Sequence, residues 1–308
     1  MGSGDVGSAE ARQPVAVAAV ADGEDLMLTP RFPFIAGREY AVVVQSGDGV
    51  VRERRITMPG VVEAAETRIT FVYPAASDVP VNLLRFYVHF SAPMSTDQAA
   101  KTVSLLRASD REPLADVFRF EPELWDRERR RLTLLLDPAR IKRGLVPNLE
   151  AGYPLRQGET VILRIDGSFR DAEGRPLVEG FECRYEVGPE LRGQIDPRRW
   201  SLTPPAAGGT EPLVVIFDRL LDHALASRCL SVVDSRRAEM SGNSFVETGG
   251  RAWVFRPDAG WAHGRYTLVI APGIEDVAGN SPVREFDRDL SAGAAFGEPV
   301  LSLPFDCA

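Results

Sequence analysis

The sequence is poor in residues with reactive or metal-binding side chains. Its 308 residues include only three cysteines and three histidines. No CxxC or CxxH spacing occurs, and the histidines are far apart along the chain, which excludes a sequence-evident zinc constellation and a disulfide framework. No apolar run approaches the roughly 18–20 residues of a membrane span. We therefore predict no bound metal, no cofactor and no transmembrane segment.

Recognisable catalytic motifs are also missing. The chain has no G-x-S-x-G sequence and no glycine fingerprint of a P-loop or a dinucleotide-binding fold. Glu121, Glu123 and Asp126 lie close together, as the two carboxylates of a glycosidase could, but acids in an exposed loop explain this spacing as well. The sequence therefore favours a protein that is not an enzyme.

The charge balance excludes a general affinity for nucleic acid. Lysine and arginine number 36 against 44 aspartates and glutamates, so the formal net charge is −8. An excess of negative charge repels phosphate backbones. The short basic runs at residues 127–131 and 140–143 are read either as solvated surface or as small anion-binding patches.

The most informative feature is an internal repeat, because a repeat determines architecture. Residues 73–178 and 201–287 align piece by piece. The clearest matches pair Phe90 with Phe217, Gly158 with Gly264, and Asp171 with Asp276. The second half of the same unit is also found near the N-terminus, from Asp25 to Val44. The chain thus contains two complete copies of one module and part of a third.

The repeated segments have the pattern of short β-strands. Leu84, Phe86, Val88 and Phe90 alternate with polar or less apolar residues, which is the period of two expected when one face of a strand is buried. Proline, glycine and aspartate bound each run. Asp171 and Asp276 are each followed after three residues by glycine, which favours a structural turn over a loose calcium loop.

Helix content should therefore be small, with one turn at 95–101 capped by Ser95 and another near 222–227. We predict an all-β fold in which each module is a sandwich of two sheets.

The second copy carries a recognisable motif, which comprises Phe217, Gly264, Tyr266, Asp276, Gly279 and Asn280. With the first copy's Phe90-Ser-Ala-Pro-Met94, this pattern resembles the bacterial Ig-like modules of S-layer and other envelope proteins. The first copy departs from it at Thr160 and Arg175, where the pattern has tyrosine and asparagine. The resemblance implies tandem Ig-like β-sandwiches with short linkers. It also implies an extracytoplasmic spacer, adhesion or accessory role.

The resemblance divides the chain into three parts. Residues 1–66 form a partial module, the C-terminal half of a repeat. Residues 67–188 form a sandwich with a basic loop insertion at 142–156, and residues 189–308 form a second sandwich and a tail. The linker 188–199 is short, so the two complete modules should be adjacent and semi-rigid. Trp200 is expected between them.

One row of side chains is the best candidate for a binding surface. Arg85, Tyr87 and His89 alternate with the apolar residues of their strand, so they should point outward. Arginine and aromatic side chains are common at interface hot spots. The predicted ligand- or partner-binding set comprises Arg85, Tyr87, His89, Trp125, Arg140, Lys142 and Arg143. A solvated sheet face would look the same.

Three functions fit these observations. The first is a non-enzymatic, modular protein of the bacterial envelope or exterior, which acts as a spacer or contacts another envelope protein or a glycan. The second is a carbohydrate-binding module, with Trp125, Trp200, Trp253 and Trp261 as candidate stacking platforms. The third is the accessory region of a secreted enzyme. The apolar run at 15–21 is read as a strand, so the sequence contains no clear signal peptide.

Overall fold

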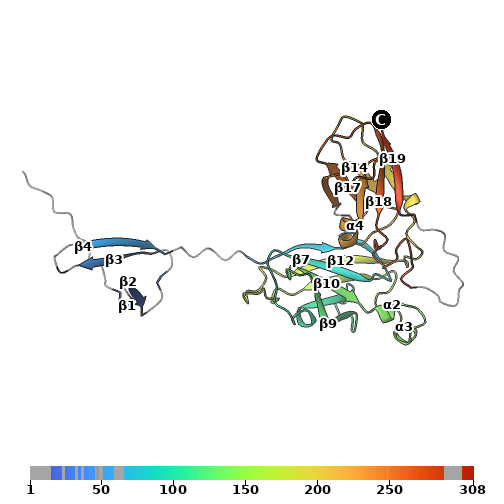
Figure 1. The fold of residues 1–308 in the computed structure, drawn as a ribbon. Helices are drawn as coiled ribbons and strands as arrows, with labels where there is room; N and C mark the ends of the chain where they lie inside the picture. Colours follow the sequence, from blue (N-terminus) through green and yellow to red (C-terminus); the bar gives the residue numbers. More distant parts are fainter. Residues whose placement is uncertain are drawn as a thin grey trace, which may run out of the picture. The chain divides into compact units, whose positions relative to one another are not determined.

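The computed structural model describes residues 15–22, 25–31, 34–35, 38–45, 47, 51–58, 66–247, 249–287 and 300–308. The chain forms two compact units, residues 1–65 and 66–308 (Figure 1). The predicted boundaries after residues 66 and 188 stay predictions. Each unit is described by itself.

The N-terminal unit contains two antiparallel hairpins. Strands β1 (Val17–Asp22) and β2 (Asp25–Pro30) form the first, and β3 (Glu39–Gln45) and β4 (Val51–Thr57) form the second. The described side chains of these strands are exposed or half-buried, and none is buried. The described part of this unit therefore has no core of its own.

The larger unit begins with a complete sandwich of eight strands (Figure 1). Its first sheet has the order β5-β7-β10-β9, from β5 (Ile69–Tyr73), β7 (Arg85–Phe90), β10 (Arg131–Leu136) and β9 (Phe118–Trp125). Its second sheet has the order β6-β12-β11-β8, from β6 (Asp78–Pro80), β12 (Phe181–Gly188), β11 (Thr160–Ile165) and β8 (Val103–Arg107). Within residues 66–188, all of which the structure describes, β6 alone pairs in parallel, with β12.

A second sandwich repeats this plan. One sheet has the order β13-β14-β17-β16, from β13 (Ser201–Thr203), β14 (Leu213–Ile216), β17 (Ala252–Pro257) and β16 (Gly242–Val246). The other has the order β15-β18-β19, from β15 (Leu230–Val233), β18 (Gly264–Ile270) and β19 (Ser302–Cys307). In chain order, both sandwiches have the A-B-E-D and C-F-G strand arrangement of Ig-like folds. The predicted all-β, tandem Ig-like architecture is confirmed.

The alternation in the sequence explains the two cores. In β7, Phe86, Val88 and Phe90 are buried and pack with residues of the facing sheet. In β14, Leu213 and Val215 occupy the same role in a separate core. Each core is formed by the inner faces of two sheets, as the period of two requires.

The predicted aspartate turns are present in both sandwiches. One side-chain oxygen of Asp171 accepts hydrogen bonds from the amides of Glu173 and Arg175, and Gly174 has a φ of +81°. Asp276 accepts from the amides of Ala278 and Asn280 in the same way. Glycine adopts this left-handed conformation without the steric cost that other residues incur. Both aspartates therefore act as turn residues.

Helices are few and short. The two predicted turns exist as α1 (Ala99–Thr102) and α4 (His223–Cys229). Ser95 does not cap α1, because its hydroxyl donates to the carbonyl of Asp171. Instead, the carboxylate of Glu123 accepts from the amides of residues 97, 98 and 99. Among the described residues, no helix is long and apolar enough to cross a membrane.

Three short helical elements were not predicted, and one side chain lies elsewhere than expected. Helix α2 (Pro138–Ile141) directly precedes the insertion, helix α3 (Val146–Ala151) lies within it, and a 3-10 turn, η1, spans Pro197–Arg199. Trp200 was expected between the sandwiches, but it packs in the second core, 4.8 Å from the ring centroid of Phe217.

Candidate functional site at the junction of the two sandwiches

The outer face of β7 lies against the second sandwich. The side chains of Arg85 and Tyr87 point away from their own core, as the alternation predicts, but only 19% of the Arg85 side chain and 6% of Tyr87 are exposed. Their contacts are with residues around α4 and around Glu275. The row that we expected to face solvent is therefore partly covered by this chain itself, and its use by another molecule stays a prediction.

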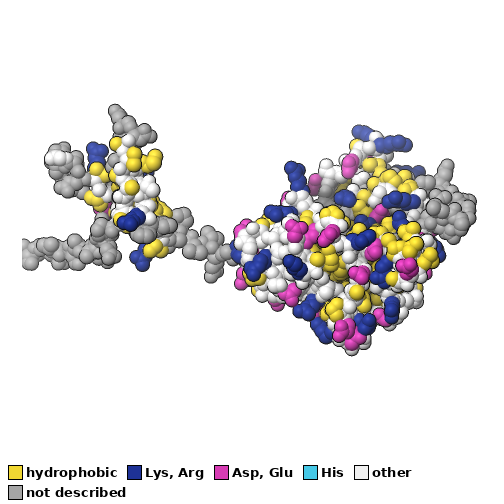
Figure 2. All heavy atoms as spheres, turned by 90° about the horizontal axis from the view of Figure 1, so that it is seen from below, with side chains coloured by type: hydrophobic (Ala, Val, Ile, Leu, Met, Phe, Trp, Pro, Cys, Tyr) yellow, Lys and Arg dark blue, Asp and Glu magenta, His cyan; other side chains and the backbone are white. Residues whose placement is uncertain are grey.

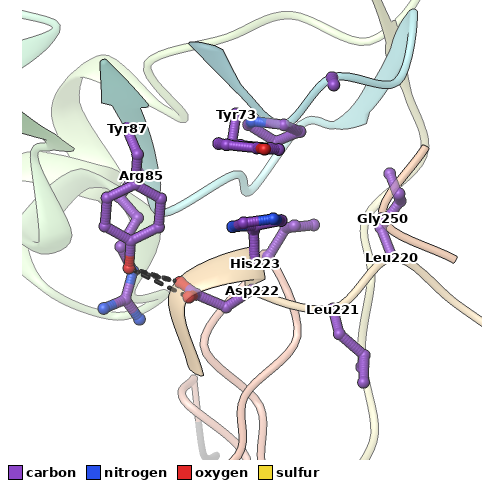
Figure 3. A pocket seen from close by; sticks show the side chains of 11 residues that line it. Tyr73, Arg85, Tyr87, Leu220, Leu221, Asp222, His223 and Gly250 are labelled. Carbon is purple, nitrogen blue, oxygen red and sulfur yellow. Dashed lines mark hydrogen bonds and ion pairs between the residues drawn. The ribbon is translucent and has the colours of Figure 1, made fainter. Parts of the chain in front are cut away.

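Asp222 is the centre of this junction (Figure 3). The Tyr87 hydroxyl donates to its two carboxylate oxygens, at 3.1 and 2.8 Å. The Arg85 Nε atom forms an ion pair with the same carboxylate at 3.2 Å. The carboxylate also accepts from the Leu225 amide at 3.0 Å and so caps α4. One buried side chain thus joins a helix of the second sandwich to a strand of the first.

Arg85 has a second carboxylate partner, Glu275. Glu275 also forms an ion pair with Arg284 at 3.4 Å. The side chains of Asp222 and Glu275 are 1% and 15% exposed. Burying a charge is costly unless it is paired, and here each buried charge has an opposite charge beside it.

Two aromatic rings stack beside this network. The rings of Tyr73 and His223 lie 3.6 Å apart, nearly parallel (Figure 3). The ring of His89 meets Tyr73 edge-on at 5.6 Å. Burial, followed by the charge of His89, lowers the pKa of His223 to about 4, although Asp222 opposes this shift. Burial and the charge of Arg131 also lower the pKa of His89. Both rings are therefore neutral near pH 7.

Apolar contacts complete the junction. Leu220 and Val277 belong to the second sandwich by sequence, but both are members of the first sandwich's core cluster. The Leu84 amide donates to the Val277 carbonyl at 2.9 Å. The cavity lined by these residues and by Arg85, Tyr87 and Asp222 has a volume of only about 10 Å³. That is room for no more than one water molecule, so this cavity is too small for an organic ligand.

The linker and the second aspartate turn are held in the same region. The side chain of Asn82 donates to and accepts from the backbone of Leu191, at 3.0 and 2.9 Å. Asn280 donates to the same Leu191 carbonyl at 3.1 Å. Asp276 pairs with Arg219 at 3.2 Å, and burial raises the pKa of Asp276 to about 6. The predicted short, semi-rigid connection thus has direct polar contacts.

Arg140, just before the insertion, and Lys142 and Arg143, at its start, also contact this chain. Arg140 donates to backbone carbonyls of residues 116, 151, 152 and 153. The Nζ of Lys142 lies 4.7 Å from the ring centroid of Phe286. Arg143 forms an ion pair with Asp287 at 2.9 Å. These three residues fix the insertion to the first sandwich and to the segment after β18. Among the described residues, none of the three forms a hydrogen bond or an ion pair with Arg85 or Tyr87.

The tryptophans do not form an exposed platform. Trp200, Trp253 and Trp261 are 6%, 0% and 1% exposed. Trp125 is half-buried against Phe90 and Phe169. Stacking on a sugar needs an accessible ring face. The carbohydrate-binding alternative therefore loses the side chains on which it was based.

The arrangement offers little chemistry. Among the described residues, no group of three or more histidine, cysteine, aspartate or glutamate side chains could hold a metal. Glu123, considered as a catalytic carboxylate, caps α1 and accepts from the Trp125 indole at 2.7 Å. On the face shown in Figure 2, acidic and basic side chains are interspersed around apolar patches. What the junction can do is hold two sandwiches in one orientation.

Sequence reasoning missed Asp222, His223 and Glu275 as site residues. Asp222 had a signal, because it begins a predicted helix and aspartate is a common N-cap residue. Glu275 had no sequence signal beyond its place before an aspartate turn. Asp222 and Tyr87 are 135 residues apart in the sequence, so no local pattern could connect them.

The histidine stack predicts a pH dependence. Because the folded pKa of His223 is about 4 and its ordinary value is 6.5, the stability that the neutral ring contributes is complete above pH 6.5. It is lost as the pH falls from 6.5 towards 4. We expect His223→Phe to remove this dependence. The free energy of unfolding of the natural protein, relative to that of the variant, should therefore fall by about 1–2 kcal/mol as the pH falls across that window, after allowance for the partial exposure of the ring.

Urea unfolding at pH 7.5, 5.5 and 4.5 measures this difference. Asp276 titrates in the same window with the opposite sign, because its raised pKa favours folding as the pH falls, and the subtraction removes its contribution. Tyr73→Phe, which keeps the stacked ring and adds no group that titrates there, is the control. A difference between the natural protein and His223→Phe that does not change with pH contradicts the prediction.

Comparison with known proteins finds only weak similarity. No protein-family model matches the chain, and a search of curated proteins finds no match. Among solved structures, the S-layer protein rSbsC(31-844) has a TM-score of 0.29 and 13% identity. The match covers 67% of this chain and 24% of that one, so the chain spans about a quarter of that protein's length.

Two further structures match in part. Native alpha-2-macroglobulin from Escherichia coli, spanning domains MG0-NIE-MG1, has a TM-score of 0.27 and 8% identity, with 79% and 72% of the two chains covered. Dpr2 Ig1-Ig2 in complex with DIP-Theta Ig1-Ig3 has a TM-score of 0.18 and 10% identity, with 64% and 85% covered. The Ig-like class of this chain rests on its strand order.

Proposed function

We propose that this protein is a non-enzymatic, modular Ig-like protein of the bacterial envelope or exterior, in which residues 66–308 act as a rigid spacer. The observation that carries the proposal is the junction, where a buried ion pair and hydrogen bonds of Asp222 join two complete sandwiches. A flexible tether between domains would need no such network. A spacer needs such a network, because its function is to hold other parts at a fixed distance and orientation.

Three observations support the spacer over a catalytic role. The polar residues that meet at the junction are paired with one another, and the cavity beside them has a volume of about 10 Å³. The larger hollows, of about 330 and 390 Å³, are open surface depressions near the insertion and near β8. Catalysis needs a nucleophile or acid and base facing a substrate-sized space. Each of the two depressions is lined by one carboxylate, Glu190 or Glu159, and each of these forms an ion pair with an arginine, Arg192 or Arg156.

The envelope or exterior location, and another envelope protein or a glycan as partner, belong to this proposal. They rest on the resemblance of the repeated motif. The three cysteines, at 183, 229 and 307, are all free thiols. The architecture therefore does not depend on an oxidising compartment.

Distance measurement between the sandwiches tests the spacer. The native cysteines are first replaced by serine or alanine, and spin labels are attached at Lys101→Cys and Arg265→Cys, which are exposed positions in the two sandwiches. We expect one narrow interspin distance. Asp222→Ala should broaden this distribution, because it removes the contacts of Arg85 and Tyr87 with α4.

The matched control is Asp258→Ala, which changes an exposed aspartate away from the junction and should leave the distance distribution unchanged. A broad distribution in the otherwise unchanged protein would show a flexible tether and overturn the spacer. Hydrolysis of a model peptide or glycan that is abolished by Asp222→Asn would replace the proposal with an enzymatic one.

A further inference from the structure

The two hairpins of the N-terminal unit expose apolar side chains that are buried at the equivalent positions of the complete sandwich. By the repeat, β2 corresponds to β17 and β3 to β18. Leu28 is 36% exposed, whereas its equivalent Phe255 is 4% exposed. Val44 is 52% exposed, whereas its equivalent Ile270 is 1% exposed. In Figure 2, apolar side chains are prominent on the surface of the smaller unit.

The complete sandwiches show what covers these positions. In both, the first sheet continues past the equivalent of β2 to a further strand, β7 or β14, and the second sheet continues past the equivalent of β3 to β8 or β15. Both strands come from the first half of the module. The described part of residues 1–65 contains only β1 to β4, so β2 and β3 have free edges where these neighbours would pair.

The hydrogen-bond pattern identifies the free donors. The Arg31 amide donates to the Ala16 carbonyl, opposite it in the hairpin, and the Met58 amide donates to the Arg38 carbonyl. Because antiparallel pairs alternate between bonded and non-bonded, the amides of Leu28 in β2 and Val43 in β3 point to the free edges. An unpaired edge of this kind is a template for another strand.

We propose that the N-terminal unit is a strand acceptor: a polypeptide segment that carries the first-half strands of the same module adds one strand to β2 and one to β3 and so completes a third sandwich. This interaction goes beyond the spacer role and does not depend on it. A second copy of residues 1–65 does not fit the described edges. It would offer the equivalents of β16 to β19 again, and the missing neighbours are the equivalents of β14 and β15.

The full chain and two synthetic polypeptides from its own complete modules test the proposal. The probes are residues 67–109 and 201–235, which contain β5 to β8 and β13 to β15. We expect saturable one-to-one binding of at least one probe. We also expect slower hydrogen exchange at Leu28 and Val43 when it is bound, with the amides that already pair inside each hairpin less affected.

Proline at a free edge provides the specificity test. Leu28→Pro and Val43→Pro each remove an edge-facing donor without removing a hairpin hydrogen bond, and proline is tolerated on edge strands. Each should weaken probe binding at least tenfold. The matched control is Ala19→Pro on β1, whose outward edge corresponds to the end strand β16 of the complete sheet, and it should bind like the unchanged chain.

Four outcomes would overturn the proposal. The first is failure of both probes to bind. The second is binding that the edge prolines leave unchanged. The third is slow exchange at Leu28 and Val43 in the chain alone at low concentration, which would show that this chain covers its own edges. The fourth is a concentration-dependent dimer in light scattering that Leu28→Pro dissociates, which would make a second copy the occupant.

Discussion

Replacing Asp222 by alanine is expected to lower the free energy of unfolding of the 66–308 unit by about 3–5 kcal/mol, the usual cost of removing one partner from a buried charge pair. The change leaves the Tyr87 hydroxyl without its acceptor and Arg85 with Glu275 alone. It also removes the N-cap of α4, which contributes about 1 kcal/mol in comparable helices. Urea denaturation followed by tryptophan fluorescence measures the loss, because three of the four tryptophans lie in the second core or at its edge.

Two variants separate the contributions of Asp222. Tyr87→Phe removes only the hydroxyl and should cost about 1–3 kcal/mol. Asp222→Asn keeps an oxygen that can cap α4 but loses the charge opposite Arg85, so its cost should lie between those of Tyr87→Phe and Asp222→Ala. If Asp222→Ala unfolds at the same urea concentration as the natural protein, the junction does not stabilise the unit as described.

Replacing Asp276 by alanine is expected to have a loss of similar size, about 3–5 kcal/mol. Asp276 is 0% exposed and organises its turn by accepting from the amides of Ala278 and Asn280. Its partner Arg219, whose side chain is only 10% exposed, would lose its buried carboxylate partner and keep Asp218 at 3.4 Å and two backbone carbonyls. The turn also contacts the first sandwich, since a Cβ on Gly279 would lie 2.9 Å from the Leu84 side chain.

The repeat supplies an internal comparison for this second prediction. Asp171 holds the equivalent turn of the first sandwich and accepts from Thr67 and Arg175, but the Arg175 side chain is 37% exposed. Water can solvate Arg175 after the loss of its partner, so Asp171→Ala should cost less than Asp276→Ala. The exposed Asp258→Ala should stay within about 0.5 kcal/mol of the natural protein. Equal losses in urea unfolding for Asp171→Ala and Asp276→Ala would contradict the role assigned to buried Arg219.

The fold could be predicted where the causes are local or repeated. The alternation of Phe86, Val88 and Phe90 determines which face of β7 is buried, and the Asp-x-x-Gly spacing determines the turns at Asp171 and Asp276. Each signal occurs within a few residues, and its presence in both copies supports the same strand order twice.

The site could not be predicted because its causes are not local. Alternation shows that Arg85 and Tyr87 point away from their own core, but it does not show what lies opposite them. Their partners Asp222 and Glu275 come from the next module, and a polar row on a sheet looks the same whether it faces water or a neighbour. The six-residue helix α3 was missed because it is too short to display a helical period.

The junction also fixes the order of the modules. With Phe90 aligned to Phe217, the positions of Arg85, Tyr87 and His89 are occupied in the second sandwich by Pro212, Val214 and Ile216. A further copy of the second module could not dock on that apolar row through an aspartate such as Asp222, because no cation or hydroxyl would meet its charge. Gene duplication alone would therefore not extend this pair into a regular array. A longer array would need a junction formed by different residues.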